Sequence, residues 1–551
     1  MTTQEKQNQY IMGTYGRFPV VLEQGKQESC QDETGKQYID FGSGIGTNSL
    51  GYCNEAWVNA VCKQAQTLQH TSNLYYTKAQ ADFAEALCKA TGYHDLFFCN
   101  SGAEANECAI KLARKYSFDK YGKGRHKILT LVNSFHGRTL CTLSATGQDV
   151  FHNYFFPFVE GFDYVTANDI ADLESKLDDT VCAVMLEYIQ GEGGVNALEQ
   201  AFVDAVFEKC AAKDVLVIAD EVQTGVGRTG TFLAGEQFGH KADVTTLAKG
   251  IAGGLPMGAC LANEKCAGVL GKGSHGSTFG GNPVCCAGGL AVLNTITADG
   301  FLAEVQRKAK LLREKLEKLD GVESVSGLGL MIGIALKDKK AIDVANAALE
   351  KGLLVLTAKT KVRLLPPLTI TDEEIEKGVA IEGGAGVGRI TRPGLAMPVG
   401  EAAINPGPRQ QITDAVHRAA EQNGYNGGFS VTISVEDGEA LAAQTYNGNL
   451  HGIGNLPYHG QGHREHSRAG QAAGILMENG TAGLNIDAHA HQGVDEGYSI
   501  CAFCLHRLGN GYNVGDIGGE LDHQRLGSGL ADLPDDLRSA FTAGAGGHAA
   551  T

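Results

Sequence analysis

Lysine is missing from the last third of the chain. Every lysine of the 551-residue sequence lies at or before Lys377. The residues after 380 are instead rich in glycine, with 32 of the chain's 74 glycines, and glycine disfavours helices by about 1 kcal/mol per residue relative to alanine. The sequence is therefore compositionally two-part, and its second part is a poor helix former.

Positive charge and long apolar runs are also scarce. Lysine and arginine number 46 against 63 aspartates and glutamates, for a formal net charge of −17, which argues against a basic nucleic-acid-binding protein. No run approaches the roughly 18 apolar residues of a membrane-spanning helix, and the first ten residues are polar. We expect a soluble, cytoplasmic protein that binds neither nucleic acid nor a membrane.

Metal-ligand spacing is absent from the first part, where 13 of the 15 cysteines are scattered, and we interpret these cysteines as reduced thiols. The second part contains His459, His463 and His466 at helical spacing and a CxxC pair, Cys501 and Cys504. Glycines between the histidines argue against a rigid ligand face, and a lone CxxC is a weak signal. We predict no metal site.

Helical stretches alternate with short apolar runs between about residues 60 and 270. The runs include 128–132, 181–186 and 215–219. Such alternation predicts an α/β domain with a mostly parallel sheet. A charged helix at 304–318, a strand at 329–335 and a further helix after residue 340 predict a smaller α+β unit.

The segment from Asn100 to Glu104 (NSGAE) predicts the start of a helix. Ser101 and Glu104 have the spacing of a capping box. The open, glycine-containing N-terminus would suit a phosphate because its backbone N–H groups are unpaired and the helix dipole is positive there. An ordinary capped helix is the simpler interpretation of this segment taken alone.

Two further features change that interpretation. The apolar run 215–219 ends in Asp220, at the edge where open α/β sheets bind ligands, and Lys249 lies in a loop of small residues. Alone, Lys249 would be read as a surface residue. A carboxylate for a pyridinium nitrogen, a phosphate-binding helix start and a lysine are together what a pyridoxal phosphate (PLP) enzyme requires.

Nine short segments resemble the class III aminotransferases of fold type I, and within them the acetylornithine aminotransferases. They are 41–50 (FGSGIGTNSL), 73–77 (NLYYT), 100–107 (NSGAEANE), 135–139 (FHGRT), 190–195 (QGEGGV), 220–225 (DEVQTG), 247–250 (LAKG), 276–283 (GSTFGGNP) and 363–368 (RLLPPL). The resemblance covers residues 1 to about 380. It implies a large domain with a mostly parallel sheet and a small α+β domain.

The resemblance also implies roles around the cofactor ring. Lys249 would hold PLP as an imine, be displaced by the amino substrate and then move a proton between substrate and cofactor. Asp220 would pair with the ring nitrogen, and Gln223 would hydrogen-bond the phenolic oxygen. Phe135 and Val222 would cover the two ring faces, although both could equally be core residues.

The cofactor phosphate, by the same resemblance, would rest on Ser101, Gly102 and Ala103. Thr278 would reach this phosphate from the other subunit, so the resemblance implies a homodimer.

Substrate recognition is implied to depend on carboxylates. The expected reaction passes the terminal amine of N2-acetyl-L-ornithine to 2-oxoglutarate, a step of arginine biosynthesis. Arg138 would bind the acylornithine carboxylate and the distal carboxylate of 2-oxoglutarate, and Arg363 its α-carboxylate, because a guanidinium binds a carboxylate in two places. Glu192 would neutralise Arg363 when the terminal amine must react. Either arginine could instead be only a salt-bridge residue.

One residue beside this site departs from the family. Tyr188 stands where the family usually has proline. Because proline would stiffen the turn, we expect a freer turn here and a possible effect on substrate preference.

The second part of the chain resembles a different family. Segments 382–412 and 424–443 resemble an internal piece of the cobalt-precorrin-5B C1-methyltransferases, and this resemblance ends near Tyr446. The helix 371–381 is expected to stop at Gly383 and Gly384. We interpret the last hundred residues as an out-of-frame translation or an artificial junction, which translation of the coding DNA in its other frames would test.

The predicted organisation has five segments. Residues 1–60 and 281–381 form the small domain, 61–280 the large PLP-binding domain, 382–446 a methyltransferase-like fragment, and 447–551 a tail without an assigned fold. Alternatives left open are a related transaminase acting on succinylornithine, ornithine or 4-aminobutyrate, a bifunctional fusion that also methylates a cobalamin precursor, and a folded but inactive cofactor-binding protein.

Overall fold

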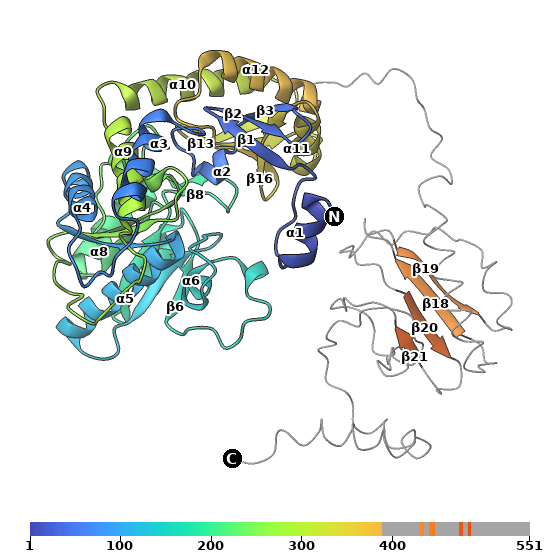
Figure 1. Cartoon of the computed structure of the whole chain (residues 1–551). Helices are drawn as coiled ribbons and strands as arrows, with labels where there is room; N and C mark the ends of the chain where they lie inside the picture. The colour runs from blue at the N-terminus through green and yellow to red at the C-terminus, as the bar shows by residue number, and fades with distance from the viewer. Residues whose placement is uncertain (388–428, 435–439, 447–472, 478–482, 486–551) are drawn as a thin grey trace, which may run out of the picture. The chain divides into compact units, whose positions relative to one another are not determined.

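The structure, a computed structural model, describes residues 1–387, 429–434, 440–446, 473–477 and 483–485 (Figure 1). The chain divides into two compact units, Met1–Pro393 and Gly394–Thr551. In the second unit, four strands pair in an antiparallel sheet of order β19-β18-β20-β21. Their bounds are β18 Phe429–Ser434, β19 Ala440–Tyr446, β20 Ala473–Met477 and β21 Gly483–Asn485. The histidine and cysteine patterns of the second part lie outside the described residues.

A seven-stranded sheet forms the centre of the first unit, in the order β4-β12-β11-β10-β7-β5-β6. The strands are β4 Asp95–Cys99, β5 Lys127–Leu131, β6 Phe162–Val165, β7 Val181–Leu186, β10 Leu216–Asp220, β11 Val244–Leu247 and β12 Gly258–Ala262. All run parallel except β12, which is antiparallel to both of its neighbours. The predicted mostly parallel sheet is therefore confirmed, and so are its apolar strands.

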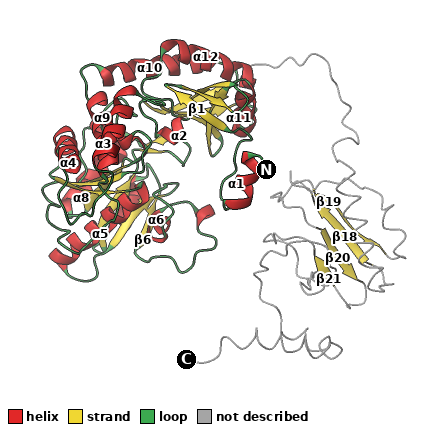
Figure 2. Ribbon diagram, in the orientation of Figure 1, coloured by secondary structure: helices red, strands yellow, loops and turns green. Residues whose placement is uncertain are grey.

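Helices cover both faces of this sheet (Figure 2). Alternate residues of β7 face opposite ways, so Ala183 and Met185 pack in the same cluster as α5 Gly102–Tyr121, whereas Val184 and Leu186 pack with α8 Gln200–Ala212. This arrangement explains why the strands are apolar without alternation, because both of their faces are buried.

Shorter helices and turns complete the large sheet's surroundings. They are α3 Glu55–Thr67, α4 Lys78–Thr91, α6 Leu140–Ala145, α7 Ile170–Lys176, η1 Asp149–Phe151, η2 Ala234–Phe238, η3 Lys249–Ala252 and α9 Pro283–Ile296. Contacts of α9 with α3, α4 and η3 place the start of the segment 281–381 against the large sheet's helices.

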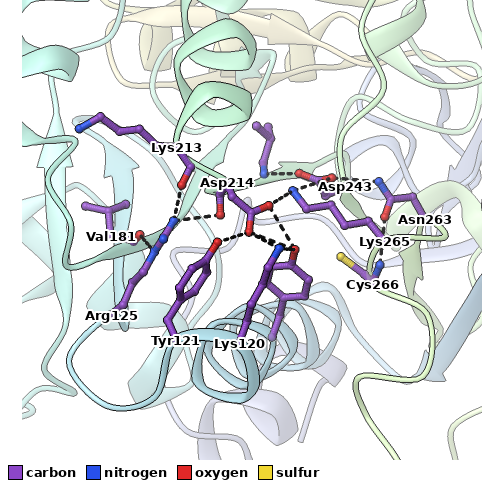
Figure 3. A network of polar contacts seen from close by, with 12 residues as sticks. Lys120, Tyr121, Arg125, Val181, Lys213, Asp214, Asp243, Asn263, Lys265 and Cys266 are labelled. Carbon is purple, nitrogen blue, oxygen red and sulfur yellow. Dashed lines mark hydrogen bonds and ion pairs between the residues drawn. The ribbon is translucent and has the colours of Figure 1, made fainter.

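A polar network fastens the amino-terminal edge of the large sheet (Figure 3). Asp214, between α8 and β10, accepts hydrogen bonds from Lys120 Nζ at 2.7 Å and from the Tyr121 hydroxyl, and its other oxygen lies 3.1 Å from Lys265 Nζ. Arg125 donates to the Asp214 carbonyl at 2.9 Å and to the carbonyl of the first residue of β7 at 3.0 Å. The C-terminus of α5 and the residues just after it are thereby hydrogen-bonded to the start of β7 and to the turn before β10.

Two smaller sheets lie outside the large one. The first has the order β1-β2-β3-β15 and the second β13-β14-β17-β16. Their strands are β1 Leu22–Lys26, β2 Ser29–Asp32, β3 Gln37–Asp40, β13 Val322–Leu328, β14 Met331–Leu336, β15 Leu353–Leu354, β16 Leu356–Ala358 and β17 Lys361–Leu364. The pairing of β3 with β15 joins the N-terminal region to the region after residue 350. A two-stranded ribbon, β8 Ile189–Gln190 and β9 Asn196–Ala197, completes the strands of this unit.

The remaining α-helices of the described residues are α1 Thr3–Tyr10, α2 Ser43–Gly46, α10 Phe301–Leu316, α11 Ala341–Glu350 and α12 Asp372–Glu382. Three of them, α10, α11 and α12, lie where the sequence predicted helices. A capping box begins α12: Thr371 Oγ1 accepts from the N–H of Glu374 at 3.2 Å, and Glu374 Oε2 accepts from the N–H of Thr371 at 2.9 Å.

The end of α12 differs from the expected stop. The α-helix ends at Glu382, but the backbone winds on through one π turn, Gly383–Val387, in which Ala385 is buried in the core. Packing of this turn outweighs the helix-disfavouring effect of glycine. Glu382 itself is buried, and neither of its carboxylate oxygens has a hydrogen-bond partner among the described residues.

The described residues contain neither a single membrane-spanning helix nor a cluster of metal ligands. No single helix there is long and apolar enough to cross a membrane, and α9 and α10 meet that test only together, across a 74° bend. Within the same residues, no three His, Cys, Asp or Glu side chains are grouped to hold a metal ion.

Candidate active site

The site residues converge on the carboxyl edge of the large sheet. Ser101 follows β4, Phe135 follows β5, Asp220 ends β10 and Lys249 follows β11. Asp220 pairs with Thr246 of the adjacent strand, three residues before Lys249. Because β4, β5, β10 and β11 run in the same direction, they deliver these side chains to one edge, where open α/β sheets bind their ligands.

Asp220 is 4% exposed, and hydrogen-bond donors contact both of its carboxylate oxygens. Its Oδ2 accepts from His136 Nδ1 at 2.7 Å and from Asn106 Nδ2 at 2.8 Å, and its Oδ1 accepts from the Val222 N–H at 3.1 Å. These donors hold the buried carboxylate in one orientation. Neither His136 nor Asn106 was among the residues predicted from sequence.

Lys249 is held in an unusual backbone conformation, with φ at +44°, at the start of η3. Burial lowers the pKa of its ammonium, and this effect outweighs the opposing attraction of Glu192 and Asp220. A lysine with a lowered pKa has more of its amine in the neutral form, which can act as a nucleophile or base.

Glu187 is a further acidic group of the site that sequence reasoning missed. It directly follows β7, is 5% exposed, and accepts a hydrogen bond from the Phe135 N–H at 3.2 Å. Burial raises the pKa of its carboxyl well above the ordinary value, and the nearby Asp220 carboxylate raises it further. The signal that could have found Glu187 is the one that identified Asp220, an acid at the end of a fully apolar strand.

The N-terminus of α5 forms the predicted helix start. Ser101 Oγ accepts from the Glu104 N–H at 3.2 Å, as expected. The Glu104 side chain, however, accepts from the N–H of Asn100 at 2.7 Å and not from that of Ser101, one residue earlier than a capping box requires. Among the described residues, no acceptor lies on the N–H groups of Gly102 and Ala103.

Val222 packs directly over the start of α5. A Cβ added at Gly102 would lie 2.7 Å from Cγ1 of Val222. Only glycine therefore permits this close approach of the two segments.

Arg363 forms the second half of the site. It is 3% exposed on β17, and its Nη1 donates to Glu192 Oε1 at 2.5 Å and to Gln223 Oε1 at 3.3 Å. Gln223 Nε2 in turn donates to the same Glu192 oxygen at 3.4 Å. Burial acts to raise the pKa of Glu192, but the Arg363 guanidinium more than offsets it, and the pKa lies below its ordinary value.

Arg138 is exposed and has no carboxylate partner within the described residues. Its guanidinium lies 4.0 Å from the ring centre of Phe151 and 5.4 Å from that of Phe135. The two rings contact each other edge to face, 5.8 Å apart. This aromatic support orients the guanidinium and leaves its donors available for a ligand.

Thr278 is exposed in the loop before α9, and its contact with the cofactor phosphate of another subunit stays a prediction. One predicted feature lies differently. Tyr188 does not loosen its turn: its ring is 1% exposed and stacks on Phe238 with centres 5.0 Å apart. Packing thus holds the turn in place of the expected proline.

The donor set of this edge fits PLP. The free N–H groups at the start of α5 suit its phosphate, the Asp220 carboxylate suits its ring nitrogen, and the Lys249 amine suits its aldehyde. His136 Nε2 is the ring nitrogen that does not contact Asp220. It is buried and has no hydrogen-bond partner in the described part of the chain.

Two known families match the chain. The family "Aminotransferase class-III" matches residues 10–382. The family "CbiD" matches residues 357–456. This second match confirms the predicted resemblance to the cobalt-precorrin-5B C1-methyltransferases, and it extends beyond Tyr446, where we expected the resemblance to end.

Individual relatives agree with the first match. Acetylornithine aminotransferase of Haemophilus ducreyi is 52% identical over 374 residues, which are 68% of this chain and 95% of the relative. N-acetylornithine aminotransferase of Stenotrophomonas maltophilia has a solved structure with 36% identity and a TM-score of 0.60, covering 67% of this chain and 96% of that one. An amine transaminase of an uncultivated Pseudomonas species, solved in the PLP-bound form, has 28% identity and a TM-score of 0.65, covering 68% and 97%.

The aminotransferase match spans more than half of the chain, and the relatives are covered almost completely. With the Lys249, Asp220 and α5 geometry already described, these matches place the chain among the class III aminotransferases, which are PLP-dependent transaminases.

Proposed function

We propose that the chain transfers the terminal amine of N2-acetyl-L-ornithine to 2-oxoglutarate, giving N-acetylglutamate 5-semialdehyde and glutamate, a step of arginine biosynthesis. The observation that carries this proposal is the pairing of Arg363 with Glu192 beside Lys249. A site for terminal amines needs a cation that can be neutralised for one substrate and exposed for the other. The resemblance to acetylornithine aminotransferases supports the choice of substrate.

PLP, when bound, makes the amine-bearing carbon of the substrate acidic by accepting its electrons. Lys249 Nζ, with its lowered pKa, would be the base that moves the proton of that carbon. The Asp220 carboxylate, fixed by His136 and Asn106, would hold the ring nitrogen in its protonated form.

Glu192 acts as a charge switch in this proposal. While Glu192 pairs with Arg363, the positive charge near the reacting carbon is neutralised, which suits a terminal amine whose carbon carries no carboxylate. When 2-oxoglutarate enters, its α-carboxylate replaces Glu192 on Arg363. The 30% exposure of the Glu192 side chain leaves it room to turn away.

Arg138 recognises the remote carboxylate of both substrates. It lies on the exposed side of the site with its guanidinium supported by Phe151, so the α-carboxylate of acetylornithine and the distal carboxylate of 2-oxoglutarate would reach it in turn. A single arginine can serve both because the two half-reactions are separated in time.

The working enzyme in this proposal is a homodimer. Thr278, exposed in a single chain, would contact the cofactor phosphate of the partner subunit. Leu74, Tyr76 and Phe279 are strongly exposed apolar side chains of the same region, and such side chains are typical of interfaces.

Separate half-reactions test the proposed function. The holoenzyme should show the visible absorbance of bound PLP, lose it with N-acetylornithine and regain it with 2-oxoglutarate, and Lys249→Ala should abolish these changes. Lys241→Ala, on an exposed loop, is the control. A holoenzyme that responds to 4-aminobutyrate or ornithine but not to N-acetylornithine contradicts the substrate assignment, and one that responds to no terminal amine contradicts the transaminase function.

A further inference from the structure

We propose that Arg228 is a positioning residue that sets the location of the Arg363 guanidinium. Arg228 lies five residues after Gln223, on the segment that follows Asp220, and its side-chain hydrogen bonds within the described residues go to backbone carbonyls and not to Arg363. The inference rests on the proposed role of Arg363 in binding 2-oxoglutarate.

Arg228 is 2% exposed and binds the backbone of both strand segments at one end of the β14–β17 pair. Its Nη1 donates to the Leu330 carbonyl at 3.1 Å and to the Pro366 carbonyl. Its own carbonyl accepts from the Leu330 N–H at 3.0 Å. Leu330 immediately precedes β14, and Pro366 follows β17 by two residues.

These two contacts lie together at one end of the strand pair that carries Arg363. Strand β14 pairs with β17 so that Gly333 is opposite Arg363 and Ile332 is opposite Leu364. One guanidinium therefore fixes the start of the first strand and the end of the second, relative to the segment that carries Asp220 and Gln223. Arg363 lies on β17 three residues before the Pro366 contact, so this fixed end sets where its side chain starts.

The backbone segments around this strand pair also pack closely against their neighbours. A Cβ added at Gly329 would lie 2.3 Å from the Thr229 carbonyl carbon, so the two backbones touch. On the other side, Ser43 Oγ donates to the Leu365 carbonyl at 2.5 Å. The segment after β17 is thus held from two directions.

Burying the Arg228 guanidinium costs free energy, which indicates that its hydrogen bonds to the two carbonyls have a structural role. No carboxylate within the described residues pairs with it, its Nη2 has no hydrogen-bond partner there, and burial lowers the pKa of its guanidinium. An unpaired buried charge is less favourable than an apolar side chain of similar volume. Its two carbonyl contacts are what an apolar replacement could not reproduce.

The test compares Arg228→Met with Arg313→Met in the holoenzyme. Arg313 is a matched control because it also donates to two backbone carbonyls, Val325 at 2.8 Å and Gly327 at 2.7 Å, at the far strand of the same sheet. The two half-reactions are followed separately by the visible absorbance of bound PLP. Binding of glutarate, an unreactive dicarboxylate, is measured by calorimetry.

We expect Arg228→Met to raise the half-saturating 2-oxoglutarate concentration about tenfold and to weaken glutarate binding about as much, since small misplacements of a binding group are costly. The half-saturating N-acetylornithine concentration should change less than about threefold. Arg313→Met should lower the melting temperature without this asymmetry.

Equal effects of Arg228→Met on both substrates, or the same asymmetry in Arg313→Met, would overturn the proposal. If Arg228→Met does not fold, Arg228→Lys provides the comparison, because lysine keeps the charge and can reach one carbonyl. An Arg228→Lys enzyme with unchanged glutarate affinity also overturns it. A wild-type enzyme that fails to react with either substrate would instead refute the proposed function.

Discussion

The Arg363 guanidinium and the Glu192 carboxylate are joined at 2.5 Å, although the Arg363 side chain is 4% exposed and that of Glu192 is 30% exposed. Arg363 Nε has no hydrogen-bond partner among the described residues. The pair is therefore asymmetric: the cation is fixed and incompletely satisfied, and the anion has access to solvent. Such an arrangement favours exchange of the anion for a substrate carboxylate.

Glu192→Gln should separate the two half-reactions. The neutral amide leaves the Arg363 charge uncompensated, so the rate with N-acetylornithine should fall about tenfold or more, whereas the rate with glutamate or 2-oxoglutarate should be largely kept. Single-turnover absorbance measurements with each substrate give the ratio. Glu199→Gln, an exposed glutamate, is the control, and equal losses in both half-reactions would argue against the switch.

Arg138→Lys should weaken both substrates together. Lysine keeps the positive charge but cannot bind a carboxylate in two places or stack on Phe151 in the same way, so we expect about a tenfold rise in KM for N-acetylornithine and for 2-oxoglutarate. Arg17→Lys is a matched control because Arg17 also lies over an aromatic ring, that of Tyr15. Unchanged KM values in the Arg138 variant would exclude its role in recognition.

Glu382→Leu should stabilise the first unit, increasingly so as the pH rises. Burial raises the pKa of the Glu382 carboxyl to about 8. Between pH 4.5, its ordinary pKa, and pH 8 the folded chain keeps a proton that the unfolded chain releases, so its unfolding free energy falls with rising pH. The leucine variant should exceed wild type by about 1 to 3 kcal/mol at pH 8, and by less at pH 5.

Fluorescence of Trp57 measures this difference in urea. Trp57 is the chain's one tryptophan, and its indole N–H donates to the Ala252 carbonyl at 2.9 Å, so its signal reports the unfolding of the first unit. Glu376→Leu, on the exposed side of the same helix, is the control. A stability gap that does not change with pH would show that Glu382 does not titrate as expected.

Asp214→Asn should cost about 1 kcal/mol of stability at pH 7 without altering either half-reaction, because the network is partly exposed and lies at the opposite edge of the sheet. Burial acts to raise the pKa of Asp214, but Lys120, Tyr121 and Lys265 outweigh it and hold the pKa below its ordinary value. Its contribution is therefore present above pH 4 and is lost as the pH falls further. Urea unfolding at pH 7 and pH 3 checks this, and a loss of activity at unchanged stability would contradict it.

Local sequence signals were sufficient for the large sheet and part of the site. The apolar run 181–186 coincides with β7, and the run ending at Asp220 coincides with β10. These signals are strong because a strand buried on both faces must be continuously apolar. Ser101 could likewise be identified as a helix start from its spacing to Glu104, although the Glu104 carboxylate accepts its hydrogen bond from the N–H of Asn100.

Contacts distant in sequence could not be predicted in the same way. His136 acquires its role only because β5 and β10 end at the same edge of the sheet. Arg228 looks like an ordinary polar turn residue until Leu330 and Pro366 are placed around it. The expected effect of Tyr188 was wrong because its partner, Phe238, is fifty residues further along the chain.

Lys377, on α12, is the last lysine of the chain, and this has a practical consequence. Because no lysine follows it, a protease specific for lysine cuts the denatured chain into many peptides up to this residue and leaves 378–551 in one piece. The mass of that piece, measured on protein taken directly from its source cells, would establish whether the two family matches occur in a single natural polypeptide.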